Sequence, residues 1–278
     1  MKRRELLKGL AAGAATLALD SKLWAQAPAG TTAARPNILW LTIEDTSAYE
    51  FGCYGNSAVK TPIIDGLAAK GVRYTHAWAA GPQCSPSRAS IITGSFGTTY
   101  GMDWHRHQVE VPGGIFYPPV LREAGYFCTN NAKTDYNATV TPRELWDENG
   151  AQATYNSAKR GANQPFFAVF NCGATHMSRL RSFTLEGRRD FVAEGLDPQK
   201  LALPPHVPDL PEVRSYYAFH LEGVQDIDGW VGSFLEDLEA RGLAEDTIVF
   251  FCSDHGGCLP RGKGFLYRTG LQVPLIAY

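Results

Sequence analysis

The sequence lacks internal repeats, low-complexity tracts and long runs of acidic or basic residues. Its formal net charge is only −2 at pH 7, so nothing in it indicates a nucleic-acid-binding protein. Instead, 44% of its 278 residues are hydrophobic and 12% are aromatic. This composition is ample for the core of one large α/β domain and is typical of a globular chain the size of an enzyme.

The N-terminal apolar segment is too short to span a bilayer as a helix of the mature protein. It covers residues 9–19, is rich in alanine and follows the basic residues 2–4. This pattern resembles a twin-arginine export signal, whereas an amphipathic helix would carry a polar face. We expect a signal peptide over 1–27, a linker over 28–35 and a folded domain over 36–278. The protein would then be periplasmic or secreted, without a stable membrane anchor.

Removing that signal would make the remaining chain more acidic. Through Lys22 the signal carries five basic and two acidic residues, so the mature chain would have a net charge near −5. An enzyme of this charge that acts on anionic substrates must concentrate its positive charge around the reacting group.

Strand-like and helix-like segments alternate along the chain. Because strands separated by helices favour a mostly parallel sheet, we predict an α/β fold. The region from Arg181 to Pro211 is rich in proline and charge, which predicts a long irregular insertion. The expected strands cover 37–43, 72–75, 126–129, 166–170, 247–252 and 273–277, and the expected helices cover 62–70, 118–124 and 213–240.

The run CSPSR begins at Cys84 and is followed by the triplet ITG, which ends at Gly94. Ser85 as N-cap, Pro86 as first helical residue and the glycine after the last turn predict a helix. Cys84 would stand at its N-terminus, where free N–H groups and a partial positive charge suit an anion such as sulfate. Arg88 lies one turn further and can point back towards Cys84. The alternative is a buried cysteine that begins an ordinary helix.

Polar and charged residues follow several predicted strands at their carboxyl ends. Ligands of open α/β sheets bind outside these ends, so the side chains there should converge. A single lysine or histidine usually lies in solvent or packs in the protein without a catalytic role. These residues become site candidates only because they all follow predicted strands. The candidates are Glu44 and Asp45 after 37–43, Lys133 after 126–129, His176 after 166–170, and Asp254 and His255 after 247–252.

Three of these candidates, Glu44, Asp45 and Asp254, are hard oxygen donors for a divalent cation. His255 would add a nitrogen donor, and the residue at position 84 would complete the set. Adjacent carboxylates repel each other unless a cation or solvent compensates them, so the pair at 44 and 45 is a candidate metal site. Its alternative is a capping or solvated loop pair.

Together these residues resemble the motifs of type I sulfatases of the alkaline phosphatase superfamily, from about Pro36 to the end of the chain. The segment 203–214 is most similar to the branch that includes heparan N-sulfatase. The resemblance implies a three-layer sandwich with a mostly parallel central sheet. It also implies a catalytic domain that is C-terminally truncated, because the family continues into a smaller subdomain. The matching segments are 37–45, the CSPSR helix, 130–137, 166–176 and 253–256.

The resemblance implies a role for each candidate residue. A formylglycine-generating enzyme would oxidise Cys84 to formylglycine, whose hydrate supplies the attacking hydroxyl, and Arg88 would steady that group. Lys133, His176 and Lys263 would hold the sulfate, with His176 as the acid that protonates the leaving group. The metal, usually Ca²⁺, would be bound by Glu44, Asp45, Asp254, His255 and the residue at position 84.

Three residues depart from the family pattern. Glu44 stands where Asp is common, which adds a methylene between backbone and metal. His255 stands where Asn is common, and its nitrogen leaves Mn²⁺ as a possible alternative to Ca²⁺. Asp135 stands where many relatives carry a histidine that helps to expel sulfate. Its position therefore makes it the candidate to replace that histidine as a base.

The six cysteines form no CxxC pair. Export would permit disulfide bonds, and Cys252 with Cys258 is the first pair to test. If Cys84 is converted, an odd five cysteines remain, so at least one stays free.

The sequence therefore predicts a sulfatase that hydrolyses sulfate esters or N-sulfo groups of sulfated saccharides. The alternative within the superfamily is a phosphonate monoester or phosphodiester hydrolase. A non-catalytic protein that binds sulfated glycans is the alternative from another class. Residues 104–107 are candidates for sugar contact, with a solvated loop as the other interpretation.

Overall fold

The computed structural model describes residues 35–181 and 195–278 of the chain. The expected signal peptide over 1–27 and all but the last residue of the linker over 28–35 lie outside these ranges and stay predictions. The described residues from Pro36 to Tyr278 belong to one compact unit. Within the described ranges, no helix combines the length and apolar character needed to cross a membrane.

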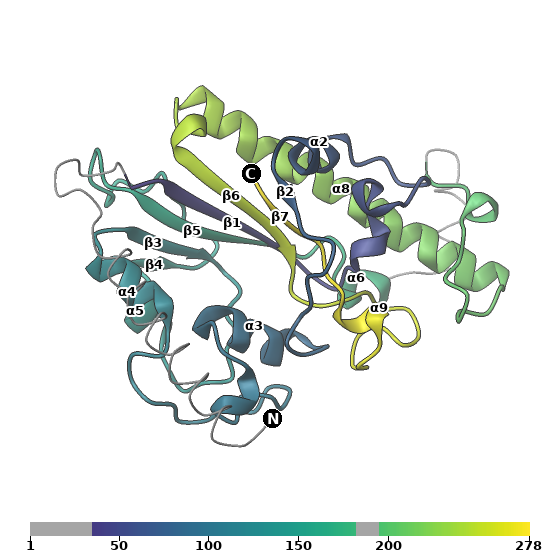
Figure 1. Ribbon diagram of the computed structural model, residues 1–278, viewed down its shortest axis with the longest axis horizontal. Helices are drawn as coiled ribbons and strands as arrows, with labels where there is room; N and C mark the ends of the chain where they lie inside the picture. Colours follow the sequence, from purple (N-terminus) through teal and green to yellow (C-terminus); the bar gives the residue numbers. More distant parts are fainter. Residues whose placement is uncertain (1–34, 182–194) are drawn as a thin grey trace, which may run out of the picture. The chain divides into compact units, whose positions relative to one another are not determined.

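A seven-stranded sheet forms the centre of this unit, in the order β2-β7-β6-β1-β5-β3-β4 (Figure 1). The strands from β6 to β4 pair in parallel, which confirms the predicted α/β fold. Only β7 breaks the pattern, since it runs antiparallel to both β6 and β2. The strands are β1 (Asn37–Ile43), β2 (Val72–Arg73), β3 (Phe127–Asn131), β4 (Glu148–Asn149), β5 (Phe166–Cys172), β6 (Thr247–Ser253) and β7 (Leu275–Ala277).

Helices cover both faces of the sheet and complete three layers (Figure 1). One face packs against α2 and α8, and the other against α3, α4 and α5. Two short helices, α6 and α9, lie in the connections that follow β5 and β6. The helices are α2 (Pro62–Lys70), α3 (Cys84–Thr93), α4 (Tyr117–Glu123), α5 (Pro142–Leu145), α6 (Met177–Arg181), α8 (Pro211–Ala240) and α9 (Arg268–Leu271).

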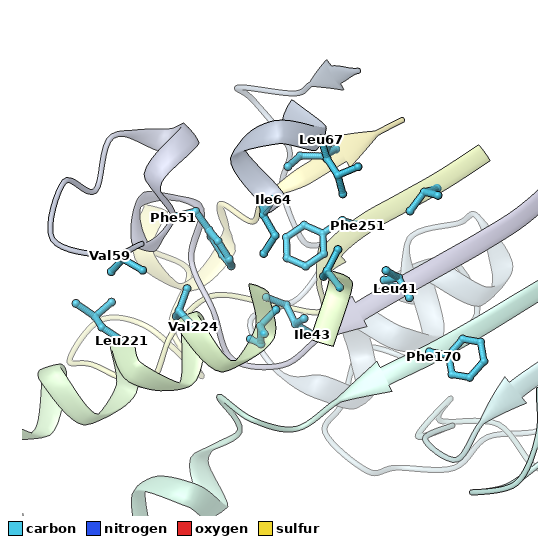
Figure 2. Packing of buried hydrophobic residues seen from close by; sticks show 14 of the residues in the cluster. Leu41, Ile43, Phe51, Val59, Ile64, Leu67, Phe170, Leu221, Val224 and Phe251 are labelled. Carbon is cyan, nitrogen blue, oxygen red and sulfur yellow. The ribbon is translucent and has the colours of Figure 1, made fainter. Parts of the chain in front are cut away.

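The central strand β1 is apolar on both faces because both are covered. Leu41 pairs in register with Phe170 of β5 and with Phe251 of β6. With Ile43 it packs in the core under α2 and α8, where Ile64 also lies (Figure 2). This core fixes the strand whose carboxyl end carries the first two acidic candidates.

The long helix α8 approaches the connection after β5 so closely that one position needs glycine. A Cβ atom on Gly223 would lie 2.7 Å from the carbonyl oxygen of Ala174. The missing side chain therefore lets α8 pack against the loop that carries His176, and the helix helps to place that histidine.

The main differences from prediction lie at element ends and in short elements. The strand expected at 72–75 covers only Val72–Arg73, and the one at 273–277 covers only Leu275–Ala277. The expected insertion contains one 3-10 turn, Pro198–Lys200, among its described residues. α8 begins at Pro211, because proline suits the first turn of a helix. The pattern did not predict α5, α6, α9 or β4, which have too few residues to show a period.

Replacing Leu41 with alanine should lower the free energy of unfolding by about 2–5 kcal/mol, because it leaves a cavity in this core. Urea denaturation followed by circular dichroism measures the change. The matched control is Leu266→Ala, whose side chain is 79% exposed and whose loss should change stability little. Equal stability of the two variants would contradict the assignment of β1 to the core.

Candidate functional site

The site forms where the carboxyl ends of the parallel strands meet. Glu44 and Asp45 directly follow β1, and Asp254 and His255 directly follow β6. Lys133 lies two residues beyond β3, and His176 lies in the connection after β5. The predicted candidates are thus brought together by the topology of the sheet.

Cys84 begins α3 and is only 1% exposed. Its Sγ lies 3.3 Å from Nε2 of His255, 3.5 Å from Nζ of Lys263 and 4.0 Å from Oδ1 of Asp45. The cysteine therefore stands at a helix N-terminus with two basic groups and one acidic group around its sulfur.

The start of α3 differs from the prediction. Gln83, not Ser85, is the N-cap residue, and the helix already includes Cys84. The Ser85 hydroxyl instead accepts a hydrogen bond from the backbone N–H of Arg106 at 2.7 Å. The predicted end of this helix is confirmed, because Gly94 follows its last turn in a left-handed conformation with φ 64°.

Asp45 is completely buried and sits at the centre of the contacts. Lys263 Nζ lies 2.8 Å from both carboxylate oxygens, and the backbone N–H of Met177 donates to Oδ2 at 2.7 Å. Nε2 of His255 lies 3.0 Å from Oδ1. Burial alone would raise the pKa of Asp45, but His255 and Lys263 lower it well below its usual range.

Asp254 is equally buried and is held by Arg88, whose Nε lies 3.1 Å from Oδ2. Its Oδ1 accepts backbone N–H bonds from Asp45 at 3.2 Å and His255 at 2.9 Å. Burial works against ionisation, but the charges of His255 and Arg88 lower the pKa of Asp254 below its ordinary value. The hydroxyl of Ser87 also donates to the Asp254 carbonyl, which ties α3 to this turn.

Glu44 faces three basic groups from three different segments. Lys133 forms an ion pair with Oε2, and His176 Nε2 lies 3.5 Å from the same oxygen. Nη2 of Arg88 lies 3.8 Å from Oε1. The carboxylate is nearly buried, so the pair at 44 and 45 is not a solvated loop pair.

His255 is a buried imidazole between two carboxylates. Burial alone would lower its pKa, but the charge of Asp254 and the hydrogen bond with Asp45 raise the pKa of His255 to about 10. Its Nδ1 lies 2.9 Å from the carbonyl oxygen of Gly256, so Nε2 is the atom that faces the site. A metal bound at Nε2 would displace a proton.

The donor atoms suit a divalent cation. Carboxylate oxygens of Glu44 and Asp45 lie within 4.8 Å of donor atoms of Cys84 and His176. Cys84 forms a second such group with Asp254 and His255. His176 is therefore a potential metal donor as well as the sulfate-binding residue that the sequence predicted.

Asp135 lies apart from these contacts. Its Oδ1 is 3.7 Å from Nε of Arg106, and its buried Oδ2 has no hydrogen-bond partner among the described residues. It has a left-handed backbone with φ 56°. Among the described residues, no hydrogen bond or ion pair joins it to Cys84, so its role as a base stays a prediction.

Two residues of the site were not predicted. Asn171, near the end of β5, accepts a hydrogen bond from Nη1 of Arg88 at 2.6 Å and donates to the Asn131 carbonyl at 3.0 Å. Asn171 directly follows the expected strand 166–170, and this position could have identified it as a site candidate. The other residue is Cys258, whose Sγ lies 3.2 Å from Oδ2 of Asp45. Nothing local in the sequence indicates that contact.

Cys252 and Cys258, the first pair to test, form no disulfide bond, and all six cysteines are free. Cys252 is buried within β6, whereas the thiol of Cys258 is directed at Asp45. The two side chains thus lie in different surroundings, and the first pair to test is not joined.

Two loops border the N-terminus of α3. Nδ1 of His105 lies 3.3 Å from the Ser85 hydroxyl, and the N–H of Gly264 donates to the Pro82 carbonyl at 2.8 Å. Each loop exposes an aromatic side chain, Trp104 at 72% and Phe265 at 55%. The stretch 104–107 therefore adjoins the helix end that carries Cys84.

Asn171→Ala should lower the free energy of unfolding by about 1–3 kcal/mol, because it leaves a buried N–H of Arg88 without its acceptor. Thermal and urea unfolding measure the loss. Asn163→Ala is the control, since that side chain is exposed and should be neutral. A neutral Asn171→Ala variant would show that the amide does not hold Arg88.

Comparison with known proteins identifies the family. The Sulfatase family profile matches residues 36–278. An ulvan-active sulfatase of Formosa agariphila is 35% identical over 87% of this chain and 47% of its own length. Human N-sulphoglucosamine sulphohydrolase is 27% identical over 89% of this chain and 56% of its own length. The chain thus spans about half the length of these curated relatives.

Solved structures agree on the fold. A Bacteroides thetaiotaomicron protein, described with the metabolism of multiple glycosaminoglycans, matches with a TM-score of 0.68 at 19% identity, over 87% of this chain and 67% of its own. The phosphonate monoester hydrolase of Agrobacterium radiobacter matches with a TM-score of 0.68 at 16% identity, over 87% and 68%. At these identities the structural likeness concerns the fold alone. The sequence match over 36–278, on this fold and with these motifs, shows that the chain belongs to the Sulfatase family.

Proposed function

We propose that the protein is a sulfatase that hydrolyses sulfate esters or N-sulfo groups of sulfated saccharides. One observation carries the proposal: the side chain at position 84 lies at a helix N-terminus, in contact with Lys263 and His255. A helix N-terminus and an ammonium group together favour an anion at this point. The relatives named for sulfated substrates support the same conclusion.

Position 84 would provide the nucleophile. Converted to formylglycine by its maturation enzyme, this residue would supply a hydroxyl of the aldehyde hydrate for attack on sulfur. Arg88 fits such a group, because its buried Nη2 has no hydrogen-bond partner among the described residues. Since Cys84 is almost completely buried, conversion would precede folding, which suits export of an already folded protein through the expected twin-arginine route.

Glu44, Asp45, Asp254 and His255 would hold a divalent cation beside position 84. Ca²⁺ suits the three carboxylates, and Mn²⁺ is also compatible with the imidazole nitrogen. When bound, the cation would supply Lewis-acid polarisation of an oxygen in the site. The ammonium groups that now neutralise these carboxylates would then be free to contact the substrate.

Lys263 and Lys133 would neutralise the sulfate oxygens. Burial disfavours the charge on Lys263, but Asp45 raises the pKa of its ammonium group above the ordinary value, so it stays a cation. Lys133 joins the same cluster of charges through its ion pair with Glu44. Fixed positive charges around the reacting group stabilise the charge that develops on its oxygens.

His176 would protonate the leaving alcohol or amine. Its Nδ1 lies 2.8 Å from the Ser178 hydroxyl, and its Nε2 faces Glu44 at 3.5 Å. Its side chain is 28% exposed, so it can reach both the site and a substrate that enters from solvent. Asp135 remains the proposed base for the release of sulfate.

The saccharide would lie across the two loops at the start of α3. Trp104 and Phe265 expose apolar ring faces there, and such faces can pack against the C–H groups of a sugar ring. His105 and Arg106 add hydrogen-bond donors in the same loop. This arrangement supports a saccharide as the leaving group.

Conversion of Cys84 is the direct test. Mass spectrometry of the peptide from Tyr74 to Arg88, made with a formylglycine-generating enzyme, should show the thiol replaced by an aldehyde. The protein should then hydrolyse an aryl sulfate in preference to an aryl phosphonate, and Cys84→Ala should abolish turnover. Cys53→Ala should retain activity, because Cys53 contacts Asp65 outside the site. An unmodified thiol, or preferred turnover of the phosphonate, would refute the proposed sulfatase mechanism.

Lys263→Gln should reduce kcat for aryl sulfate by roughly 10²–10³-fold, as expected for loss of a group that stabilises the developing charge. Steady-state kinetics in excess Ca²⁺ separate this effect from weaker metal binding. Lys200→Gln is the matched control, because that lysine side chain is 83% exposed. Unchanged kcat in Lys263→Gln would remove this residue from the reaction.

A further inference from the structure

A second thiol reaches the acidic centre from the loop after β6. Cys258 is half-buried, and its Sγ lies 3.2 Å from Oδ2 of Asp45. The loop is fixed on both sides of this residue. The N–H of Gly257 donates to the Ser47 hydroxyl at 2.9 Å, and the N–H of Lys263 donates to the Gly257 carbonyl at 2.7 Å.

The side chains of Asp45 and His255 lie between the two thiols, at distances similar to those between neighbouring ligands of a metal ion. Asp45 Oδ2 neighbours Cys258, Oδ1 lies 3.0 Å from His255 Nε2, and that nitrogen lies 3.3 Å from Cys84 Sγ. In a tetrahedral zinc site with metal–sulfur bonds of about 2.3 Å and metal–nitrogen bonds of about 2.0 Å, neighbouring donors lie about 3.3–3.8 Å apart. These three spacings are slightly shorter than the tetrahedral values, and Cys84 Sγ lies 4.0 Å from Oδ1 of Asp45. The ammonium group of Lys263, 2.8 Å from both Asp45 oxygens and 3.5 Å from Cys84 Sγ, would have to move aside as the cation enters and the two thiols close on it.

The donor chemistry differs from that of the carboxylate cluster. Two sulfurs, an imidazole nitrogen and one carboxylate oxygen form a set that prefers Zn²⁺ or Cd²⁺. Ca²⁺ prefers oxygen donors and gains little from thiols. The same cluster of side chains therefore presents a soft donor set through Cys84 and Cys258 and a hard one through Glu44, Asp45 and Asp254.

We propose that the unconverted chain, with a thiol at position 84, binds a thiophilic divalent cation through Cys84, Cys258, His255 and Asp45. Each thiol loses its proton to the buffer as a sulfur–metal bond forms, and no oxidant or reductant takes part. Conversion of Cys84 removes one of the two sulfurs. The modification thus shifts the preference of the site from a thiophilic cation towards one that prefers oxygen.

The test uses the full chain produced without a formylglycine-generating enzyme and freed of metal by chelation. Cd²⁺ is added while the ultraviolet absorbance of thiolate-to-cadmium charge transfer is recorded, and Zn²⁺ affinity is measured against a chromophoric chelator. We expect one Cd²⁺ per chain with the absorbance of two thiolates, which excess Ca²⁺ does not displace. Absence of this band in the wild-type chain would overturn the proposal without reference to any variant.

Variants identify the ligands. Cys258→Ser and Cys84→Ser should each lose about half of the absorbance and bind Zn²⁺ roughly tenfold or more weakly. Cys53→Ser is the matched control, because Cys53 is also half-buried beside a carboxylate, Asp65, and should behave like the wild type. Circular dichroism verifies that each variant is folded.

Full absorbance in Cys258→Ser would exclude Cys258 as a ligand and refute the proposed site. The measurement concerns metal binding by the thiol form, whereas turnover requires the converted form. Failure of this proposal is therefore distinguishable from failure of the sulfatase proposal.

Discussion

The arrangement of this site depends on basic side chains that neutralise the negative charge of two buried carboxylates. Asp45 and Asp254 have no solvent exposure, and an unpaired charge in such a place would be strongly destabilising. Arg88 from α3 and Lys263 from the loop after β6 supply the opposite charge. Because the acids sit at strand ends and the bases on other segments, each ion pair also fixes the position of one segment relative to the sheet. The same pairing places the ammonium group of Lys263 3.5 Å from Sγ of Cys84.

Much of the fold could be predicted because its signals are local. β1 is a continuous apolar run, and its bounds agree with the expected ones. α2 begins at Pro62 and ends before Gly71, as proline and glycine indicate. The start of α3 could not be predicted, because the hydroxyl of Ser85, a good cap by type, binds the Arg106 backbone 21 residues away. The contact with Arg106 takes up the Ser85 hydroxyl, and the helix begins one residue after Gln83 instead.

The same distinction applies to the site. Residues directly after strands were predictable, since the topology of a parallel sheet brings such positions together. The contact of Asn171 with Arg88 and that of Cys258 with Asp45 each join segments more than 80 residues apart. No periodicity or motif records contacts of this kind. They follow only from the packing of α3 and the loop after β6 onto the strand ends.

Two of the three residues expected to depart from the family pattern, Glu44 and His255, have related physical consequences. The longer side chain of Glu44 lets its two oxygens face Arg88, Lys133 and His176, which come from three segments. The ring of His255 is oriented by the Gly256 carbonyl at Nδ1, so that Nε2 is the donor presented to Asp45 and to position 84. A hydrogen bond at the far nitrogen is the usual device for fixing a histidine as a metal ligand. The orientation of His255 is therefore compatible with a role as a metal ligand.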